Sequence, residues 1–174
     1  VDLEQLRRRF ELGFDGTARE HWDFGSSWRH ENRDGNKSFG AVIGNNGGNP
    51  RAVLIPEPID YSSDDFDAVM SFRDQKKQFS LAYHASLFDN NQGSFGWENP
   101  YNSINGWTPV VVGFPNGEGQ AGGPPENQFH QVSAAGGWNF SGSMRLDGDL
   151  AYGRSSQDDD YLPYTINPAL AATI

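Results

Sequence analysis

Cysteine is absent from the 174 residues of this chain. Its absence excludes disulfides, zinc–thiolate and iron–sulfur sites, covalently attached haem and thiol nucleophiles. Positive charge is scarce, because 13 Lys and Arg stand against 23 Asp and Glu, for a formal net charge of −10. That balance argues against nucleic acid as a partner and against docking on anionic lipid headgroups. No stretch approaches the ~18 consecutive apolar residues of a transmembrane helix, a run that barrel strands do not need.

Apolar residues are nevertheless numerous enough to order the chain. Hydrophobic residues make up 36% of the sequence and aromatic residues 13%, which argues against disorder. A chain of this length is expected to be one domain, and no repeat or linker divides it. We therefore expect residues 1–174 to be part of a single domain.

The clearest pattern is an alternation of large apolar residues with polar or small ones. Trp22, Phe24 and Trp28 alternate with charged or small residues, and the same period of two returns at 66–73 and 79–87. This periodicity predicts β-strands that are apolar on one face only.

Two tight hairpins can be assigned a register from this alternation. A three-residue loop at 141–143 predicts the pairs Phe140 with Met144, Trp138 with Leu146, Ala134 with Leu150, and Val132 with Tyr152. A turn at 74–77 predicts the pairs Phe72 with Phe79, Met70 with Leu81, and Ala68 with Tyr83. Every pair is apolar, and a slip of one residue would scramble the faces.

Two long segments, at 31–63 and 89–127, separate the strands. Both are rich in glycine and asparagine, and we expect them to be loops. The opening segment 3–12 is expected to be a strand that turns at 13–16. Tight turns then lie at one end of the strands and long loops at the other. This arrangement is typical of outer-membrane barrels and predicts an all-β fold, a piece of an antiparallel transmembrane β-barrel with about five to six strands, long outer loops and short periplasmic turns.

Two motifs in these loops give weak evidence for a binding site. Residues 117–122 match G-x-G-x-x-G, but the following Gly-Pro-Pro forbids the helix that a dinucleotide site needs, so a loop is predicted. Residues 89–93 begin like a calcium loop, but Pro100 occupies the place of the bidentate glutamate and excludes an EF-hand. A looser calcium site from Asp89, Asn91 or the run 158–160 stays open.

Catalytic signals are poor. His21, His30, His84 and His130 have no metal-binding spacing, and no serine lies in a nucleophile elbow. Asp147 and Asp149 share a strand face, as a glycosidase pair could, but lack an apolar enclosure. We predict that the chain is not an enzyme and carries no catalytic, cofactor or metal site.

In a barrel, the two faces of the strands would meet different surroundings. The residues predicted to face lipid are Trp22, Phe24, Trp28, Met70, Leu81, Trp138, Leu146 and Leu150. The residues predicted to face the lumen and its occupant are Arg19, His21, Asp23, Arg29, His84, Arg145, Asp147 and Asp149. Aromatic residues near strand ends, expected to form interfacial girdles, are Trp22, Trp28, Tyr83, Trp138 and Tyr152.

The same alternation would also suit a soluble β-sandwich whose core holds these side chains. Such a protein would bind carbohydrate, with Trp97, Tyr101 and Trp107 as stacking platforms.

Several stretches in a fixed order carry a resemblance that covers nearly the whole chain. They are GFDGTAR at 13–19, PEPID at 56–60, WENPY at 97–101, PPENQFHQ at 124–131, GDLAYGR at 148–154 and LPYTINP at 162–168. Together they resemble the MtrB/PioB family of outer-membrane β-barrels, which accompany decahaem c-type cytochromes.

The resemblance implies a large barrel in the outer membrane of a Gram-negative bacterium. Its lumen would surround a decahaem c-type cytochrome, and electrons would cross the membrane along haem c groups carried by that partner and not by this chain. An extracellular multihaem cytochrome could meet the long loops. About five to six strands are too few for such a barrel, so we expect an internal fragment of a longer protein. A general porin without a cytochrome is the alternative.

Overall fold

The computed structural model describes residues 3–46, 49–98 and 118–163, and β-strands dominate this part of the chain. The strands are β1 (Gln5–Arg19), β2 (Trp22–Asn46), β3 (Asn49–Arg73), β4 (Lys77–Asn90), β5 (Ser94–Glu98), β6 (Glu118–Gly122), β7 (Asn127–Ser141) and β8 (Met144–Ser156). No helix among these residues is long and apolar enough to cross a membrane.

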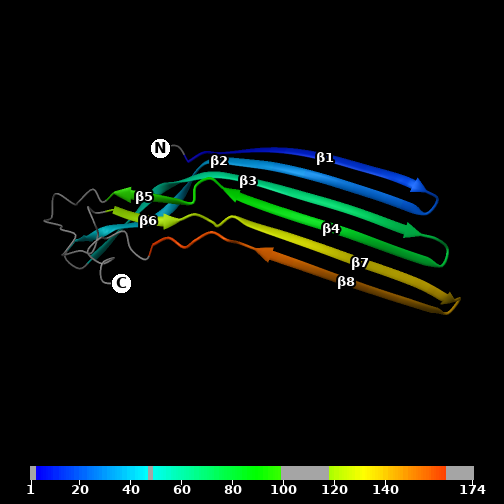
Figure 1. Cartoon of the computed structure of the whole chain (residues 1–174). Coiled ribbons are helices and arrows are strands. Elements are labelled where there is room, and N and C mark those ends of the chain that lie inside the picture. The colour runs from blue at the N-terminus through cyan, green and yellow to red at the C-terminus, as the bar shows by residue number, and fades with distance from the viewer. Residues whose placement is uncertain (1–2, 47–48, 99–117, 164–174) are drawn as a thin grey trace.

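Six strands form one antiparallel sheet in the order β1-β2-β3-β4-β7-β8, and β5 and β6 pair separately (Figure 1). Strands adjacent in the main sheet are therefore also successive along the chain, apart from the β5–β6 excursion. The turns that join β1 to β2, β3 to β4 and β7 to β8 all lie at the same end of the sheet (Figure 1). The predicted placement of the short turns is confirmed.

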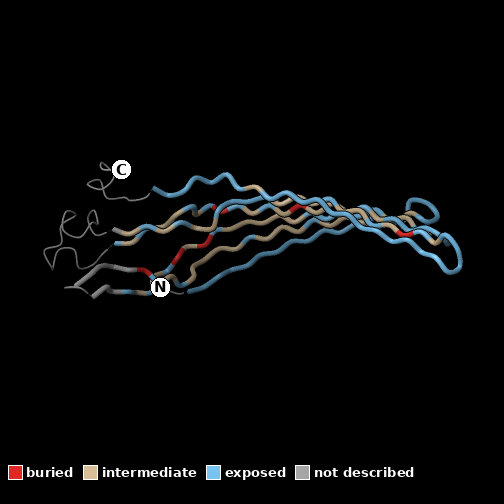
Figure 2. The backbone as a smooth tube through the Cα atoms, turned by 90° about the horizontal axis from the view of Figure 1, so that it is seen from below, coloured by how far each residue is buried: buried red, intermediate tan, exposed pale blue. Residues whose placement is uncertain are grey.

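The main sheet is a single layer. Among the described residues only Ala41, Ile59 and Ala85 are buried apolar side chains, and most of the backbone is exposed or intermediate (Figure 2). A sandwich would need a second sheet over the apolar face, and none covers it within the described residues. The described residues therefore do not form the β-sandwich of the alternative. Of its three proposed stacking residues, Trp97 lies in β5, whereas Tyr101 and Trp107 lie outside the described residues.

Both predicted hairpin registers are confirmed over the lengths of their strands. Met70 pairs with Leu81 between β3 and β4, and Trp138 pairs with Leu146 between β7 and β8. The predicted pair of Phe140 with Met144 is wrong, because the register shifts between Asn139 and Ser141 and Met144 lies opposite Ser141. This irregularity tightens the turn and leaves the rest of the ladder in the predicted register.

The segment 31–63, predicted to be a loop, is instead the outer part of the β2–β3 hairpin. The two strands stay paired from Trp22 opposite Phe72 to Asn46 opposite Asn49. Glycine and asparagine predict loops through their own conformational preferences, but a backbone ladder between two long strands satisfies the same residues. Segment 31–63 therefore lies at the predicted end of the sheet, but the prediction that it is a loop is wrong.

Prolines fit into β3 because their missing N–H groups face an open edge. The Asn36 N–H donates to the Glu4 carbonyl on the β1 side, so Asn36 and its partner Pro58 make no backbone bonds to each other. On the other side, the Asn91 N–H donates to the Asp60 carbonyl. The backbone groups of Pro56 and Pro58 point to the same side of β3 as those of Asp60, and β4 has already ended there. An edge position is where a strand tolerates proline.

The opening segment is a strand, as predicted, but it does not turn at 13–16. β1 runs on to Arg19, and the turn lies at Glu20 and His21, where His21 has a φ of 82°. Phe10, Leu12 and Phe14 keep one face of β1 apolar, and the pairing with β2 continues past Gly13 and Gly16. The two glycines are therefore strand residues and do not reverse the chain.

The segment 89–127 is not one loop, because its described parts include β5 and β6. Residues 118–122 of the G-x-G-x-x-G match form β6, so the predicted loop is wrong there. A Cβ added to Gly119 would overlap the indole ring of Trp97, which lies against the β6 backbone. Glycine is required at this position by an aromatic side chain and not by a phosphate group.

The β3–β4 turn is held by a carboxylate. Asp74 Oδ1 accepts hydrogen bonds from the backbone N–H groups of Lys76 and Lys77 at 2.7 and 2.6 Å. These two bonds hold the pKa of Asp74 below its ordinary value.

Because the folded-state pKa of Asp74 is depressed, its stabilisation is present above the ordinary value of 3.8 and is lost as the pH falls through the folded-state pKa. The substitution Asp74→Asn should therefore destabilise this turn at pH 7 and have a shrinking effect in acid. Hydrogen exchange of the turn amides in wild type and variant, compared at each pH, measures this difference. A gap between them that is independent of pH would contradict the carboxylate's role.

Candidate functional site

The main sheet has one continuous apolar face. Opposite residues of an antiparallel ladder lie on the same face, so Phe24, Met70, Leu81, Ala134 and Leu150 form a row across five strands. All eight residues predicted to face lipid lie on this face, namely Trp22, Phe24, Trp28, Met70, Leu81, Trp138, Leu146 and Leu150. We call it the apolar face.

Aromatic side chains mark the turn end of the apolar face. The rings of Trp22 and Phe72 lie 5.0 Å apart between centroids, and those of Trp138 and Phe140 lie 4.5 Å apart. The Lys77 ammonium lies 5.1 Å from the Trp138 ring centroid. Rings with a nearby cation are typical of a membrane–water interface.

The other edge of the apolar face carries aromatic side chains whose polar atoms are bonded. Trp28 Nε1 donates to Asp64 Oδ1 at 2.8 Å, and His30 Nδ1 lies 3.0 Å from the same oxygen. The Tyr83 hydroxyl lies 2.8 Å from His130 Nδ1. Trp28 and Tyr83 were predicted near strand ends, but they lie within long strands, where the apolar side chains give way to polar ones.

The height of the apolar face follows from these two edges. On β7 the edges are marked by Trp138 and His130, which are about 27 Å apart at ~3.4 Å per residue. Strand tilt of roughly 40° would reduce this to about 21 Å, close to the ~25 Å apolar band of outer-membrane barrels.

The opposite face, which we call the polar face, carries an ion-pair network on β1, β2 and β3. Arg29 lies between Glu11 and Asp65 in one row, with nitrogen–oxygen distances of 3.6 and 3.5 Å. Glu31 accepts from Arg7 at 2.6 Å and from Arg33 at 3.3 Å. Arg7, Arg29 and Arg33 in the outer half of this face therefore each have a carboxylate partner.

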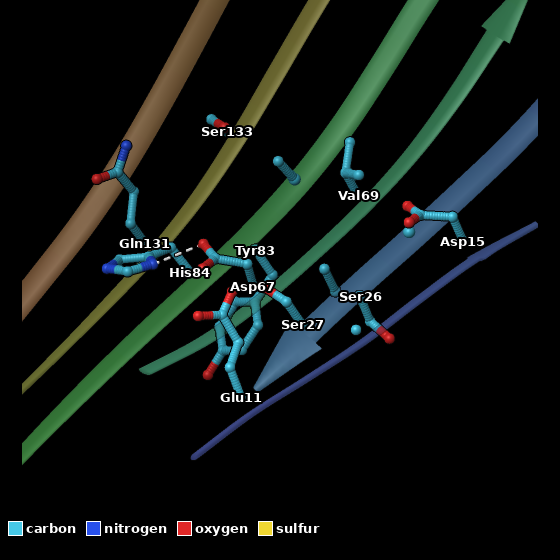
Figure 3. A pocket seen from close by; sticks show the side chains of 14 residues that line it. Glu11, Asp15, Ser26, Ser27, Asp67, Val69, Tyr83, His84, Gln131 and Ser133 are labelled. Carbon is cyan, nitrogen blue, oxygen red and sulfur yellow. Dashed lines mark hydrogen bonds and ion pairs between the residues drawn. The ribbon is translucent and has the colours of Figure 1, made fainter. Parts of the chain in front are cut away.

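Small side chains leave hollows on the polar face nearer the turn end. One hollow of about 600 Å³ is lined by Gly13, Gly25, Ala82 and Ser133 among others, and by Asp67, which lies 2.8 Å from His84 Nδ1 (Figure 3). A second, of about 500 Å³, lies between β2 and β8 and includes Asp23 and Asp149 in its lining. In the half nearer the turns, the polar face therefore has small side chains, hollows and several carboxylates.

Six of the eight residues predicted to face a lumen share the polar face. They are Asp23, Arg29, His84, Arg145, Asp147 and Asp149. The other two are corrected by the turn at 20–21. Arg19 ends β1 after a register shift, and the His21 ring lies 6.0 Å from that of Phe72, an apolar-face residue. Alternation extrapolated through a turn fails because the turn breaks the period of two.

Several charged residues of the polar face were not singled out from the sequence. Glu31 and Arg33 fell in a segment predicted to be a loop. Arg7 lies opposite Arg33, whereas Glu11 and Asp65 both lie opposite Arg29. The alternation of Glu11 with Phe10 and Leu12 was the available signal, and the length of β2 was the missing fact.

Catalytic or metal chemistry finds no support in the described residues, where no group of three or more His, Asp or Glu side chains is placed to hold a metal. Asp147, half of the weak glycosidase pair, makes three hydrogen bonds from Arg145 at 2.7–2.9 Å. Its side chain is exposed at 55%, whereas a general acid needs burial to raise its pKa.

Comparison with known proteins agrees with this architecture. Residues 1–173 match the family described as outer membrane beta-barrel porin, MtrB/PioB. The chain is also 27% identical over 158 residues to the outer membrane protein MtrB of Shewanella baltica (strain OS185). That match covers 91% of this chain and 21% of the relative, so the chain spans about a fifth of the relative's length. The one-sided antiparallel sheet and the family match lead to the same conclusion: this chain belongs to the MtrB/PioB family of outer-membrane β-barrel porins.

Proposed function

We propose that this chain is part of the wall of a large outer-membrane barrel that surrounds a multihaem c-type cytochrome and holds it for electron transfer across the membrane. The observation that carries the proposal is the division of one sheet into an apolar and a polar face. The apolar face would contact lipid and the polar face the lumen. The wall would act passively, by insulation and positioning, with haem c supplied by the partner.

Contact with lipid would remove the exposed side chains of the apolar face from water. Leu150 is 74% exposed and Leu146 62% exposed, although both are large aliphatic side chains. Each Å² of apolar surface moved out of water stabilises a protein by about 25 cal/mol, so a face of this kind is unstable in water. Its edges end in aromatic rings with bonded polar atoms, as expected at the two membrane interfaces.

A protein occupant suits the polar face better than an open aqueous pore does. The hollows lined by small side chains would let another surface approach the wall closely. In the described part of the chain, Asp15, Asp23 and Asp149 make no ion pair, so these carboxylates could pair with basic groups of an occupant. The resemblance to a cytochrome-associated family supports a multihaem c-type cytochrome as that occupant.

Further strands would be needed to enclose such a partner. Six strands are fewer than the ~8 that enclose only side chains. In the main sheet β1 and β8 each pair on one side only. We propose that these edges pair with other strands of the longer barrel, since an open edge is not tolerated in hydrocarbon. The outer end of the β2–β3 hairpin would then meet an extracellular multihaem cytochrome.

Purification of the full-length protein from its own outer membrane in mild detergent tests the proposal. We expect haem absorbance to co-elute with the barrel. The variant Asp149→Arg on the polar face should retain less haem than wild type, and Asp158→Arg, beyond the end of β8, should retain as much. A barrel that conducts ions in a planar bilayer and never co-elutes with haem would instead be a general porin.

A further inference from the structure

The β2–β3 hairpin extends well beyond the main sheet. β1 begins opposite Gly35 and β4 ends opposite Tyr61, so residues 36–46 and 49–60 have no neighbouring strand of the main sheet beside them. We call this part the outer arm. At ~3.3 Å per residue it projects roughly 35 Å beyond the six-stranded region.

The short β5–β6 sheet packs on one face of the outer arm. The ring of Phe39 lies 5.0 Å from that of Phe95 in an edge-to-face contact and 5.8 Å from that of Trp97. Phe39 has the same parity on β2 as Asp23 and Arg29, with no register shift between them. The β5–β6 sheet therefore lies on the continuation of the polar face.

Several residues on the Phe39 side of the outer arm are buried. Ala41 is 2% exposed and Ile59 5% exposed, on the same side of the arm as Phe39. Glu57, also buried at 6%, accepts from Lys37 Nζ at 2.8 Å. The hydrogen bond to Glu57 raises the pKa of Lys37 and so favours the charged ammonium.

The base of the β5–β6 sheet is tied to the ends of β4 and β7. The Gly123 N–H donates to the Gly93 carbonyl at 3.0 Å. Asn90, which is 6% exposed, donates from its side chain to the Pro124 carbonyl at 2.7 Å and accepts from the Gln92 N–H at 2.9 Å. These bonds hold both ends of the excursion on the polar-face side.

We infer that the β5–β6 sheet overhangs the lumen and narrows its outer opening, so that it restricts the passage of ions and small solutes. A sheet packed on the inner face of a wall, beyond the membrane-spanning rows, has to occupy part of the mouth. The inference rests on the proposed inward orientation of the polar face, but it does not depend on the cytochrome.

Single-channel conductance of the full-length barrel, reconstituted in planar bilayers without any partner, tests this inference. Phe39→Asp places a carboxylate in the aromatic contact and should release the β5–β6 sheet, which raises the conductance. Leu54→Asp is the matched control, because Leu54 lies on the opposite face of the same arm and is 77% exposed. Its conductance should equal that of wild type.

A second variant alters the β5–β6 sheet itself and not the outer arm. Gly119→Val adds a side chain where the Trp97 ring lies, and it should also raise the conductance. Heat-modifiable migration in electrophoresis shows whether each barrel is folded, and Phe39→Ala replaces Phe39→Asp if the latter is not. Folded variants with wild-type conductance would overturn the inference. Absence of co-eluting haem would overturn the cytochrome partner and leave the conductance result standing.

Discussion

Replacing Leu150 with arginine is expected to destabilise the membrane-folded barrel by about 2–4 kcal/mol, the usual effect of a basic side chain near the bilayer midplane. Leu150 lies on the apolar face, between the row of Trp138 and Leu146 and the row of His130 and Arg154. Its side chain is 74% exposed in the chain, so hydrocarbon is the surrounding that the arginine would disturb. Urea unfolding of the full-length protein in lipid vesicles measures the loss.

The control for this prediction is Ala151→Arg. Ala151 is the next residue of β8, is exposed and pairs with Ser133 on the polar face. An arginine there would face the lumen and should change the free energy of unfolding little. Equal losses from the two substitutions would show that the faces are assigned wrongly.

Replacing Gly35 with alanine should weaken the junction of β1 with β2. Gly35 has a φ of +131°, a backbone conformation that side chains rarely adopt and whose strain is worth about 1–3 kcal/mol. A Cβ at this position would also collide with the Glu4 carbonyl, which accepts the Asn36 N–H at 2.9 Å. We expect the free energy of local opening to fall by at least the strain term, as read from hydrogen exchange of the Asn36 amide.

Gly40→Ala serves as the comparison for Gly35→Ala. Gly40 lies on the same strand, and a Cβ there would have no heavy atom within 4 Å. Hydrogen exchange near β1 should stay at the wild-type rate. Faster exchange in both variants would mean that β2 responds to any loss of glycine flexibility, and the backbone argument for Gly35 would fail.

Local pattern was sufficient where a strand alternates and its turn is short. Met70 opposite Leu81 and Trp138 opposite Leu146 follow from the requirement that one face stay apolar. The same rule sorted six of the predicted polar residues onto one face. It failed at Arg19 and His21 because a turn interrupts the period of two.

The outer arm was missed because its signal is not local. Residues 36–46 and 49–60 contain glycine, asparagine and proline, which lower strand preference one residue at a time. Their pairing depends on a long partner in register and on the β5–β6 sheet, which packs over Phe39. The length of β2 in turn hid Glu31 and Arg33 as members of the polar-face network.

Alternation within the amino-acid sequence alone determined that this chain forms one-sided antiparallel strands, which residues share a face, and that the turns at 74–77 and 141–143 are tight. Side chains two residues apart always point the same way along a strand, so no tertiary contact is needed for that conclusion. Only the tertiary structure decided how far β2 and β3 extend and where the β5–β6 sheet packs. Those features depend on contacts between residues distant in sequence, whose strength no single segment reveals.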